Sequence, residues 1–329
     1  MKAVLKWTGW LALGLAVLLA VTYLALRRPD IPFSTLEAKY ANSASRYLDL
    51  PGELRVHYRD QGNSKGPVLV LVHGFSASLH TWEPWVGLLG KQYRIITLDL
   101  PGHGLTRAPK TYLPSIDAYA DLVAQATAKL DAPKFVLGGN SMGGGVAWNL
   151  ATRYPERLNG LVLVDSAGWP HEGENARSPL VFNLLRYPLA RALGQQLDTS
   201  SLVAAGLKDA FHNKALVDQA MIDRYVDLGR ADGHRAQIMA LQTGRKTMTQ
   251  AEAKAALGQI KVPTLVMHGE DDALIPVADG KALAAAIPGA TLILYPDTGH
   301  IPMEEKAAQS AADLDAWLKS KGLVGAAKP

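Results

Sequence analysis

The 329-residue sequence contains no cysteine. This excludes thiol nucleophiles, thiolate metal sites and disulfide bonds, but it leaves the compartment open, since a cysteine-free chain suits oxidising and reducing surroundings alike. Aromatic residues make up only 7% of the chain, and its formal charge of +4 is scattered without a long basic run. Because a nucleic-acid groove combines clustered basic residues with aromatic ones, we expect no nucleic-acid partner.

The usual cofactor and metal motifs are also missing. There is no His-Glu-x-x-His pair, and the nine histidines do not follow metal-ligand spacing. No Gly-x-Gly-x-x-Gly opens the first predicted strand–helix unit, and the glycine-rich segment GNSMGGG lacks the Lys-Ser/Thr ending of a phosphate loop. We therefore expect neither a metal ion nor a cofactor.

One long apolar run stands at the start of the chain. Residues 7–26 carry no charge and lie between Lys6 and Arg27. As a helix this run is roughly 30 Å long, enough to cross the hydrocarbon core of a bilayer. A cleaved signal peptide has a shorter apolar stretch and small residues at its cleavage site, a pattern that fits poorly here. We predict that residues 1–28 form an uncleaved membrane anchor.

The orientation of this anchor is not decided by charge. Lys2 and Lys6 precede the run, and Arg27 and Arg28 follow it, so the positive-inside rule is nearly balanced. Single N-terminal anchors commonly hold a globular domain outside the cytoplasm, and we expect a periplasmic or extracytoplasmic domain on that basis.

After the anchor, short apolar segments alternate with helical patterns. The continuous apolar runs that predict buried strands are PVLVLVHG, YRIITLDL, KFVLGGN, LNGLVLVDSAG, VPTLVMHGE and ATLILYP. Strands that alternate with helices predict a largely parallel sheet covered on both faces. We expect residues 29–168 and 259–329 to form this α/β core.

The segment between these two parts breaks the alternation. Residues 169–258 contain amphipathic helical patterns, such as SLVAAGLKDAF, and no convincing strand. This stretch is too long for a simple crossover connection. We predict an all-helical cap, inserted between two strands of the sheet.

The segment Gly139-Asn140-Ser141-Met142-Gly143 has the form Gly-x-Ser-x-Gly and lies between a buried strand and a helix. A sharp strand-to-helix turn exposes the serine hydroxyl, and the flanking glycines leave room for the neighbouring backbone. The helix that follows directs its positive end at the same place, which favours developing negative charge. Ser141 is therefore predicted to be a nucleophile.

A serine nucleophile needs a base, and the base needs an acid that orients it. Two loops after the helical insertion supply these groups. An acidic loop follows the strand VPTLVMHGE, and His300 lies in the loop after ATLILYP.

From about Arg46 onward, the chain resembles the α/β-hydrolase fold family in its esterase- and lipase-like branch. The resemblance is carried by five ordered motifs, which are HGF at 73–75, DLPGHG at 99–104, GNSMGG around Ser141, GEDDALIP at 269–276 and GH at 299–300. It implies an α/β fold with a mostly parallel eight-stranded sheet, flanking helices and an inserted helical cap.

The same resemblance implies roles for individual residues. Ser141 is the expected nucleophile and His300 the general base. Asp272 is the expected acid, because it occupies the aspartate position of the family's G-x-x-D-x-x-x-P loop. Asp271 is the adjacent alternative, and Asp165 is the alternative for relatives that take the acid from an earlier strand. The backbone N–H groups of two further residues, Phe75 and Met142, are the expected oxyanion hole.

The expected reaction is hydrolysis of a carboxylic ester through an acyl-enzyme. A serine nucleophile argues against the epoxide hydrolases and haloalkane dehalogenases of this fold, which use aspartate. Carbon–carbon bond hydrolysis of the meta-cleavage type and acyl transfer remain alternatives. A non-catalytic receptor or scaffold is disfavoured, since all three triad positions are filled.

The expected substrate is a small-molecule or lipid-like ester. Apolar residues of the predicted cap are candidates for lining an acyl pocket, and these are Leu180, Phe182, Leu184, Leu185 and Leu189.

Overall fold

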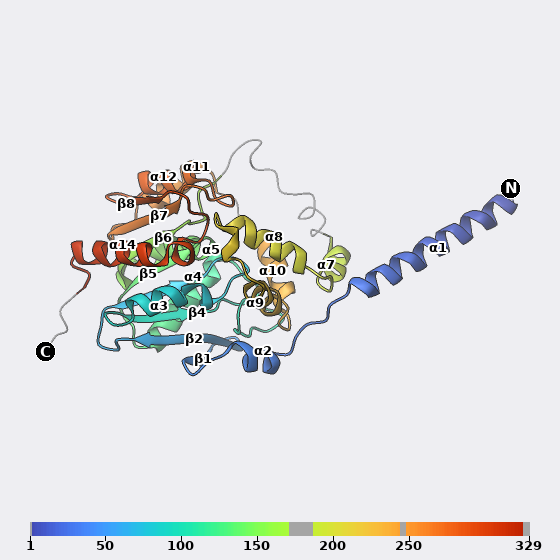
Figure 1. Ribbon diagram of the computed structural model, residues 1–329, viewed down its shortest axis with the longest axis horizontal. Coiled ribbons are helices and arrows are strands. Elements are labelled where there is room, and N and C mark those ends of the chain that lie inside the picture. The colour runs from blue at the N-terminus through green and yellow to red at the C-terminus, as the bar shows by residue number, and fades with distance from the viewer. Residues whose placement is uncertain (1, 171–186, 244–247, 325–329) are drawn as a thin grey trace.

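The computed structural model describes residues 2–170, 187–243 and 248–324 of the chain. A sheet of eight strands runs through the globular part, helices cover both of its faces, and one long helix projects away from it (Figure 1). The predicted fold, a mostly parallel eight-stranded sheet with flanking helices, is confirmed.

The order across the sheet is β1, β2, β4, β3, β5, β6, β7, β8. Strand β2 is antiparallel to both of its neighbours, whereas all pairs from β4 to β8 are parallel. The strands are β1 (Ser45–Leu50), β2 (Leu54–Gly62), β3 (Val68–Val72), β4 (Arg94–Leu98), β5 (Phe135–Asn140), β6 (Leu158–Val164), β7 (Thr264–Gly269) and β8 (Thr291–Tyr295). Every residue of β5 and β7 is buried, as the unbroken apolar runs predict for strands covered on both sides.

Two hydrophobic cores hold the layers together, one on each face of the sheet. The first joins the sheet to α4, α5 and α12, and α11 packs against this layer. The second joins the opposite face to α3 and α14. The helices of the two layers are α3 (Glu83–Leu89), α4 (Ile116–Lys129), α5 (Met142–Arg153), α11 (Gln250–Leu257), α12 (Val277–Ala286), α13 (Pro302–Glu305) and α14 (Ala307–Ser320).

In the described parts of the chain between β6 and β7, the regular secondary structure is helical, with short turns and connections between the helices. Besides α11, its helices are α7 (Pro188–Gly194), α8 (Ser200–Ala210), α9 (Gln219–Gly229) and α10 (His234–Thr243). In the described parts of 169–258, no residue belongs to the sheet.

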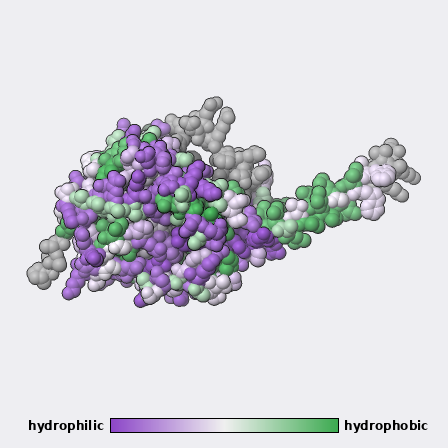
Figure 2. Space-filling view, viewed as in Figure 1, coloured by the Kyte–Doolittle hydropathy of each residue, from purple (hydrophilic) through white to green (hydrophobic). Residues whose placement is uncertain are grey.

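At the N-terminus, α1 (Lys2–Leu26) extends beyond the globular part and is followed by a short connection to α2 (Phe33–Tyr40) (Figure 1). Its segment Trp7–Leu26 is long and apolar enough to cross a membrane and has none of its length buried in the protein. Figure 2 shows it as a hydrophobic rod beside a mostly hydrophilic globular surface. A signal sequence passes the same test of length and composition.

This topology brings several loops to one edge of the sheet. In parallel strands the carboxyl ends share an edge, and in open α/β sheets that edge is where ligands bind. The loop after β3 carries Phe75, the turn after β5 carries Ser141, and the loops after β7 and β8 carry Asp272 and His300.

Candidate active site

Ser141 occupies the turn between β5 and α5 in a backbone conformation that few residues adopt. Its φ is 53° and its ψ is −119°, a combination strained for any residue with a Cβ. The turn is fixed by hydrogen bonds on both sides. The N–H of Ser141 donates to the carbonyl of Val164 (3.0 Å), and its carbonyl accepts from Gly145 (3.1 Å) and Ala167 (2.9 Å). The surrounding structure thus holds the strained residue in place.

The glycines of the Gly-x-Ser-x-Gly motif are required by close backbone contacts. A Cβ on Gly139 would overlap the backbone of Gly143, and a Cβ on Gly143 would overlap the carbonyl oxygens of Val72 and His73. At these two positions the strand, the turn and the helix lie too close together for any residue but glycine, as the sequence motif predicts.

The structure pairs His300 with Asp272. Nδ1 of His300 donates to Oδ2 of Asp272 (2.7 Å), and Oδ1 of the same carboxylate accepts from the amides of Leu274 (2.7 Å) and Ile275 (2.9 Å). Burial acts to raise the pKa of Asp272, but its hydrogen bond with His300, the histidine's charge and the two amides outweigh burial and lower it. Asp272 is therefore an ionised acceptor that fixes the orientation of the imidazole.

The histidine loop is also tied to the nucleophile turn. The side-chain amide of Asn140, the residue before Ser141, donates to the carbonyl of His300 (3.0 Å) and to that of Val164 (3.2 Å). These bonds bring the backbone of His300 to the turn that carries Ser141.

The two alternative acids have other partners. Oδ2 of Asp271 lies 3.0 Å from Nδ1 of His212, a residue just after α8, and both side chains are nearly half exposed. Asp165 is fully buried at the end of β6, where its Oδ1 accepts from the amide of Gly269 (2.8 Å). Of the three carboxylates weighed from the sequence, Asp272 is the one that the structure hydrogen-bonds to His300.

The predicted oxyanion-hole residues lie around Ser141. Met142 is the first residue of α5, and the first amides of a helix have no acceptor within that helix. The loop after β3 approaches from the other side, since a Cβ added to Gly74 would lie 3.1 Å from Cβ of Ser141. Phe75 follows Gly74, and its ring packs edge-on against that of His103 with centroids 6.0 Å apart.

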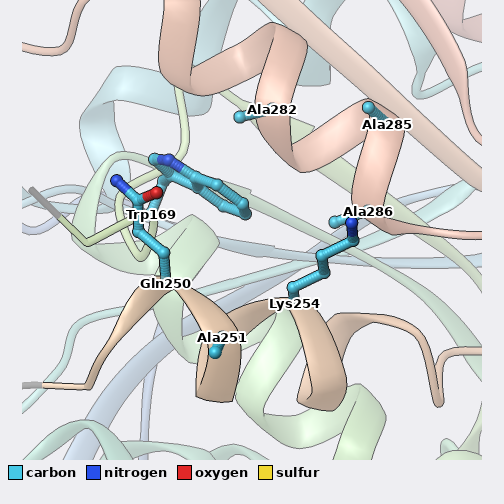
Figure 3. A pocket seen from close by; sticks show the side chains of 7 residues that line it. All are labelled: Trp169, Gln250, Ala251, Lys254, Ala282, Ala285 and Ala286. Carbon is cyan, nitrogen blue, oxygen red and sulfur yellow. The ribbon is translucent and has the colours of Figure 1, made fainter.

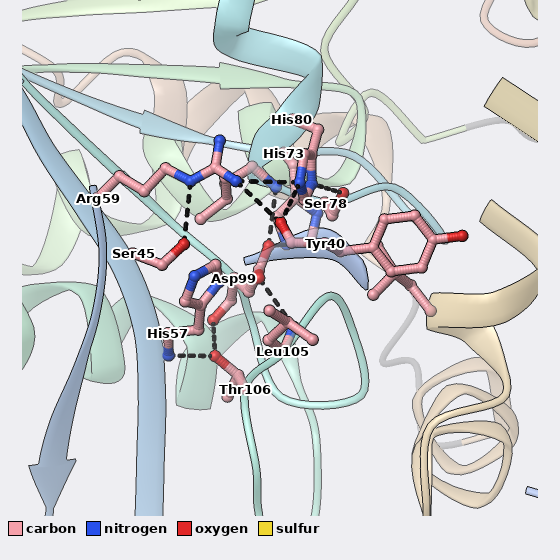
Figure 4. A network of polar contacts seen from close by, with 12 residues as sticks. Tyr40, Ser45, His57, Arg59, His73, Ser78, His80, Asp99, Leu105 and Thr106 are labelled. Carbon is pink, nitrogen blue, oxygen red and sulfur yellow. Dashed lines mark hydrogen bonds and ion pairs between the residues drawn. The ribbon is translucent and has the colours of Figure 1, made fainter. Parts of the chain in front are cut away.

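A buried network around Asp99 holds the loop of Phe75, and sequence reasoning did not find it. The carboxylate of Asp99 accepts from the amides of Leu79 (2.8 Å) and Leu105 (2.9 Å), and from Nδ1 of His57 (2.7 Å) (Figure 4). Burial opposes ionisation, but the neighbouring histidines lower the pKa of Asp99 well below its usual value. The loops after β3 and β4 are thereby joined through one charged side chain. The sequence signal was the aspartate that opens DLPGHG.

His73 and His103 brace the loops after β3 and β4. Nδ1 of His73 donates to the carbonyl of Gly74 (2.7 Å), and its Nε2 accepts from the amide of Leu100 (3.0 Å). Nδ1 of His103 donates to the carbonyl of Pro101 (3.1 Å). Burial lowers the pKa of both histidines, so both are neutral supports.

Two groups of side chains bring potential metal-ligand atoms within 4.8 Å of one another. These groups are Asp165 with His268 and Asp272, and His212 with Asp271 and Asp297. In the first group, Nε2 of His268 donates to the carbonyl of Ile275 (3.0 Å), and Asp272 accepts from His300. Nε2 of His268 and the carboxylate of Asp272 are thus already hydrogen-bonded within the protein. The second group is exposed, and exposed acidic clusters are common without a metal.

Two hollows lie apart from these residues. One, of about 390 Å³, lies between α11 and α12 beside Trp169 (Figure 3). The other, of about 330 Å³, is lined by residues that include Asp30, Lys110 and Gln237. Neither is lined by a predicted catalytic residue.

Of the apolar cap residues considered for an acyl pocket, only Leu189 is described, and its side chain is 71% exposed on α7. The other four lie outside the described residues, and they are Leu180, Phe182, Leu184 and Leu185.

Comparison with known proteins identifies the family to which this fold belongs. The alpha/beta hydrolase fold family matches residues 67–307, a range that includes every predicted catalytic and oxyanion residue. The chain belongs to this family.

Individual relatives include a methyl ester esterase and a dienedioate hydrolase. The chain is 29% identical over 268 residues to the pimeloyl-acyl-carrier-protein methyl ester esterase of Nitrosomonas europaea, a match covering 79% of this chain and 98% of that protein. It is 28% identical over 270 residues to the 2-hydroxy-6-oxononadienedioate/2-hydroxy-6-oxononatrienedioate hydrolase of Comamonas testosteroni, covering 77% of this chain and 87% of that one.

A solved structure matches almost the whole chain. It is a membrane phospholipase A, described as a bacterial virulence factor, with a TM-score of 0.71 and 25% identity. The match covers 98% of this chain and 99% of that protein. Because α1 alone is 25 residues long, a match of this extent includes most of α1.

Proposed function

We propose that this protein is a serine hydrolase that cleaves carboxylic esters through an acyl-enzyme. Ser141 is the nucleophile, His300 the general base and Asp272 the acid that orients it. The observation that carries the proposal is the 2.7 Å hydrogen bond between Nδ1 of His300 and Asp272, in a loop whose backbone is bonded to the turn of Ser141. A histidine held through Nδ1 presents Nε2 as the proton acceptor.

The reaction proceeds in two halves. In the first, Oγ of Ser141 attacks the ester carbonyl while Nε2 of His300 takes its proton, and His300 then protonates the leaving alcohol. In the second, His300 takes a proton from water, the hydroxide attacks the acyl-enzyme, and the acid leaves as Ser141 regains its proton. Asp272 stays ionised and stabilises the imidazolium formed in each half.

The backbone amides of Phe75 and Met142 hold the oxyanion of each tetrahedral intermediate. One such donor is worth roughly 3 kcal/mol of transition-state stabilisation. The Asp99 network has a supporting role here, because it fixes the loop from which Phe75 donates.

Residues 169–258 are proposed to form a cap over this site. Two contacts of its described part support this. The carbonyl of Ala210, at the end of α8, accepts from the amide of His300 (2.7 Å), and His212 pairs with Asp271 (3.0 Å). The helical insertion is therefore bonded directly to both loops that carry the base and the acid.

The proposed substrate is an acyl ester of a membrane lipid. Two observations support this class. The segment Trp7–Leu26 places the protein at a bilayer if it is retained, and the match to a membrane phospholipase A extends over 98% of the chain. Residues 1–28 are accordingly proposed to be a membrane anchor, with the enzyme on the extracytoplasmic side.

The cysteine-free chain offers a direct test of this orientation. Single-cysteine variants Leu88→Cys and Lys2→Cys are treated in intact cells with a membrane-impermeant maleimide. Labelling of position 88 alone is expected, whereas labelling of position 2 alone would reverse the orientation. Cleavage of the anchor would separate residue 2 from the mature chain and show as a smaller protein.

The reaction is tested with the full chain in detergent on p-nitrophenyl esters from acetate to palmitate, and on diacyl and monoacyl phosphatidylcholine. Ser141→Ala is the matched control. Hydrolysis that the substitution abolishes, with a preference for long acyl chains, is the expected result. Activity on a meta-cleavage dienoate without ester activity would instead assign carbon–carbon bond hydrolysis. Transfer of the acyl group to an added alcohol in preference to water would assign acyl transfer.

A further inference from the structure

The chain does not leave α1 as a free linker, because it is bonded at once to the helical insertion. The carbonyl of Leu26, the last residue of α1, accepts from the amide of Asp198 (2.9 Å). The amide of Arg28 donates to the carbonyl of Gln196 (2.7 Å), and Arg27 forms an antiparallel bridge with Leu197. These bonds form a short strand-like pairing between the end of α1 and the segment that joins α7 to α8.

A buried arginine fastens the next residues. The guanidinium of Arg235, only 7% exposed on α10, donates to the carbonyl of Arg28 (2.7 Å) and to the carboxylate of Asp30. The amide of Ile31 donates to the carbonyl of Arg230 (2.7 Å), whose own guanidinium donates to the carbonyl of Pro29 (2.9 Å). The connection from α1 to α2 is therefore anchored along its length.

These hydrogen bonds fix where α7 and the start of α8 lie along the axis of α1, beside its C-terminal end. The amide of Gln196 donates to the carbonyl of Leu193 (3.2 Å), so only two backbone hydrogen bonds separate Arg28 from α7. If Leu26 lies where a membrane span ends, α7 lies in the interfacial layer of the same leaflet. Figure 1 shows α7 at the edge of the globular part from which α1 projects.

Large apolar side chains are exposed on α7 and at the start of α8. Leu189 is 71% exposed and Leu193 44%, and Ala192 beside them is also exposed. Positions 189, 192 and 193 share one face of a helix. Tyr187 before α7 is 66% exposed, and Leu202 in the first turn of α8 is 71% exposed. We call these five residues the juxtamembrane face.

We propose that the juxtamembrane face inserts into the headgroup and acyl boundary of the bilayer that holds α1. This rests on the proposed membrane anchoring. An amphipathic surface of leucines and a tyrosine is the chemistry that such a boundary accepts. Arg27, the residue after α1, adds positive charge at the end of the apolar span, where anionic headgroups occur.

The inference gives α8 a role in placing the active site. Its first turn carries Leu202 of the juxtamembrane face, and the carbonyl of Ala210 at its other end holds the amide of His300. From Ser200 to Ala210 the helix rises roughly 15 Å. The proposed membrane contact therefore lies at one end of a helix whose other end is hydrogen-bonded to His300.

The test uses single-cysteine variants of the full chain, reconstituted in vesicles of phosphatidylcholine and phosphatidylglycerol. Leu193→Cys and Leu202→Cys are labelled with an environment-sensitive fluorophore. The control is Leu88→Cys on α3, whose wild-type side chain is 48% exposed, close to the 44% of Leu193. Lipids carrying a nitroxide near the headgroup serve as quenchers.

A blue-shifted emission and strong quenching are expected at positions 193 and 202, with neither at position 88. Equal, water-like emission at all three positions would overturn the inference. If the protein failed to float with the vesicles, residues 1–28 would not be a membrane anchor, and the inference would fail with that proposal. Because no readout depends on turnover, the result holds whether or not the protein hydrolyses esters.

Discussion

One oxygen of Asp272 lies 2.7 Å from Nδ1 of His300, while its other oxygen accepts from two amides of the following loop. The neighbouring carboxylate of Asp271 instead lies 3.0 Å from Nδ1 of His212. The two adjacent aspartates thus have different partners. Asp272 pairs with His300, the proposed base, and Asp271 pairs with His212 of the helical insertion.

This difference predicts unequal effects of two matched substitutions. Asp272→Asn replaces an acceptor by an amide and favours the wrong tautomer of His300, so we expect kcat to fall about 10⁴-fold. Asp271→Asn removes only a half-exposed pair, and we expect kcat within about threefold of wild type. Ester hydrolysis by both purified variants measures this. If both substitutions lowered kcat by the same factor, Asp272 alone would not be the acid that orients His300.

Asp165 predicts a dependence of stability on pH. Burial and the charge of Asp272 raise its pKa well above the usual value, and its Oδ2 has no hydrogen-bond partner among the described residues. A carboxyl whose pKa is raised in the folded protein holds its proton more tightly there than in the unfolded chain, where its pKa is about 3.9. Its contribution to the free energy of unfolding is therefore complete below about pH 3.9. As the pH rises from there towards the folded-state pKa, the contribution falls by at most about 1.4 kcal/mol per pH unit.

Asp165→Asn keeps the shape of the neutral side chain and cannot ionise. We therefore expect the stability of this variant relative to wild type to be greater at pH 8 than at pH 5. Thermal unfolding in detergent at the two pH values measures the difference. A variant whose relative stability falls as the pH rises would mean that Asp165 is ionised and stabilising.

The glycine run at the start of α5 predicts opposite effects of the same substitution. A Cβ on Gly143 would overlap two backbone carbonyls, whereas the nearest atom to a Cβ on Gly145 is the carbonyl of Ala167 at 3.5 Å. We expect Gly143→Ala to cost about 1–3 kcal/mol and, by displacing Ser141, to lower kcat roughly 100-fold. Gly145→Ala should raise the free energy of unfolding by about 0.5–1 kcal/mol, because alanine loses less conformational entropy than glycine when it enters a helix.

Unfolding midpoints and kcat of the two variants, measured side by side, decide this. The account is contradicted if Gly143→Ala matches wild type in both, since the turn would then have room for a side chain.

The parts of the site that the sequence predicted are those set by local sterics and motif spacing. Ser141 was predicted because a turn between a buried strand and a helix admits only glycine at its flanks. Asp272 was preferred among three carboxylates by its place in the loop, and the structure pairs it with His300. The mostly parallel sheet followed from apolar runs that alternate with helical patterns.

What the sequence did not predict depends on contacts between distant segments. The pair of His57 and Asp99 joins residues 42 positions apart, and neither residue has a local pattern that names the other. The bonds of Arg235 to Arg28 and Asp30 span more than 200 positions. Such pairs are selected by the packed fold, so they become visible only when the segments are placed together.

The central claim is that Ser141 is an activated nucleophile, and covalent labelling tests it most directly. The full chain is treated with a fluorophosphonate, and the modified peptide is mapped by mass spectrometry, with His300→Ala as the control. We predict a single adduct on Ser141 that forms far more slowly in the control. A folded wild-type protein that carries no adduct on Ser141, or is labelled on another residue at the same rate in both proteins, would contradict the account.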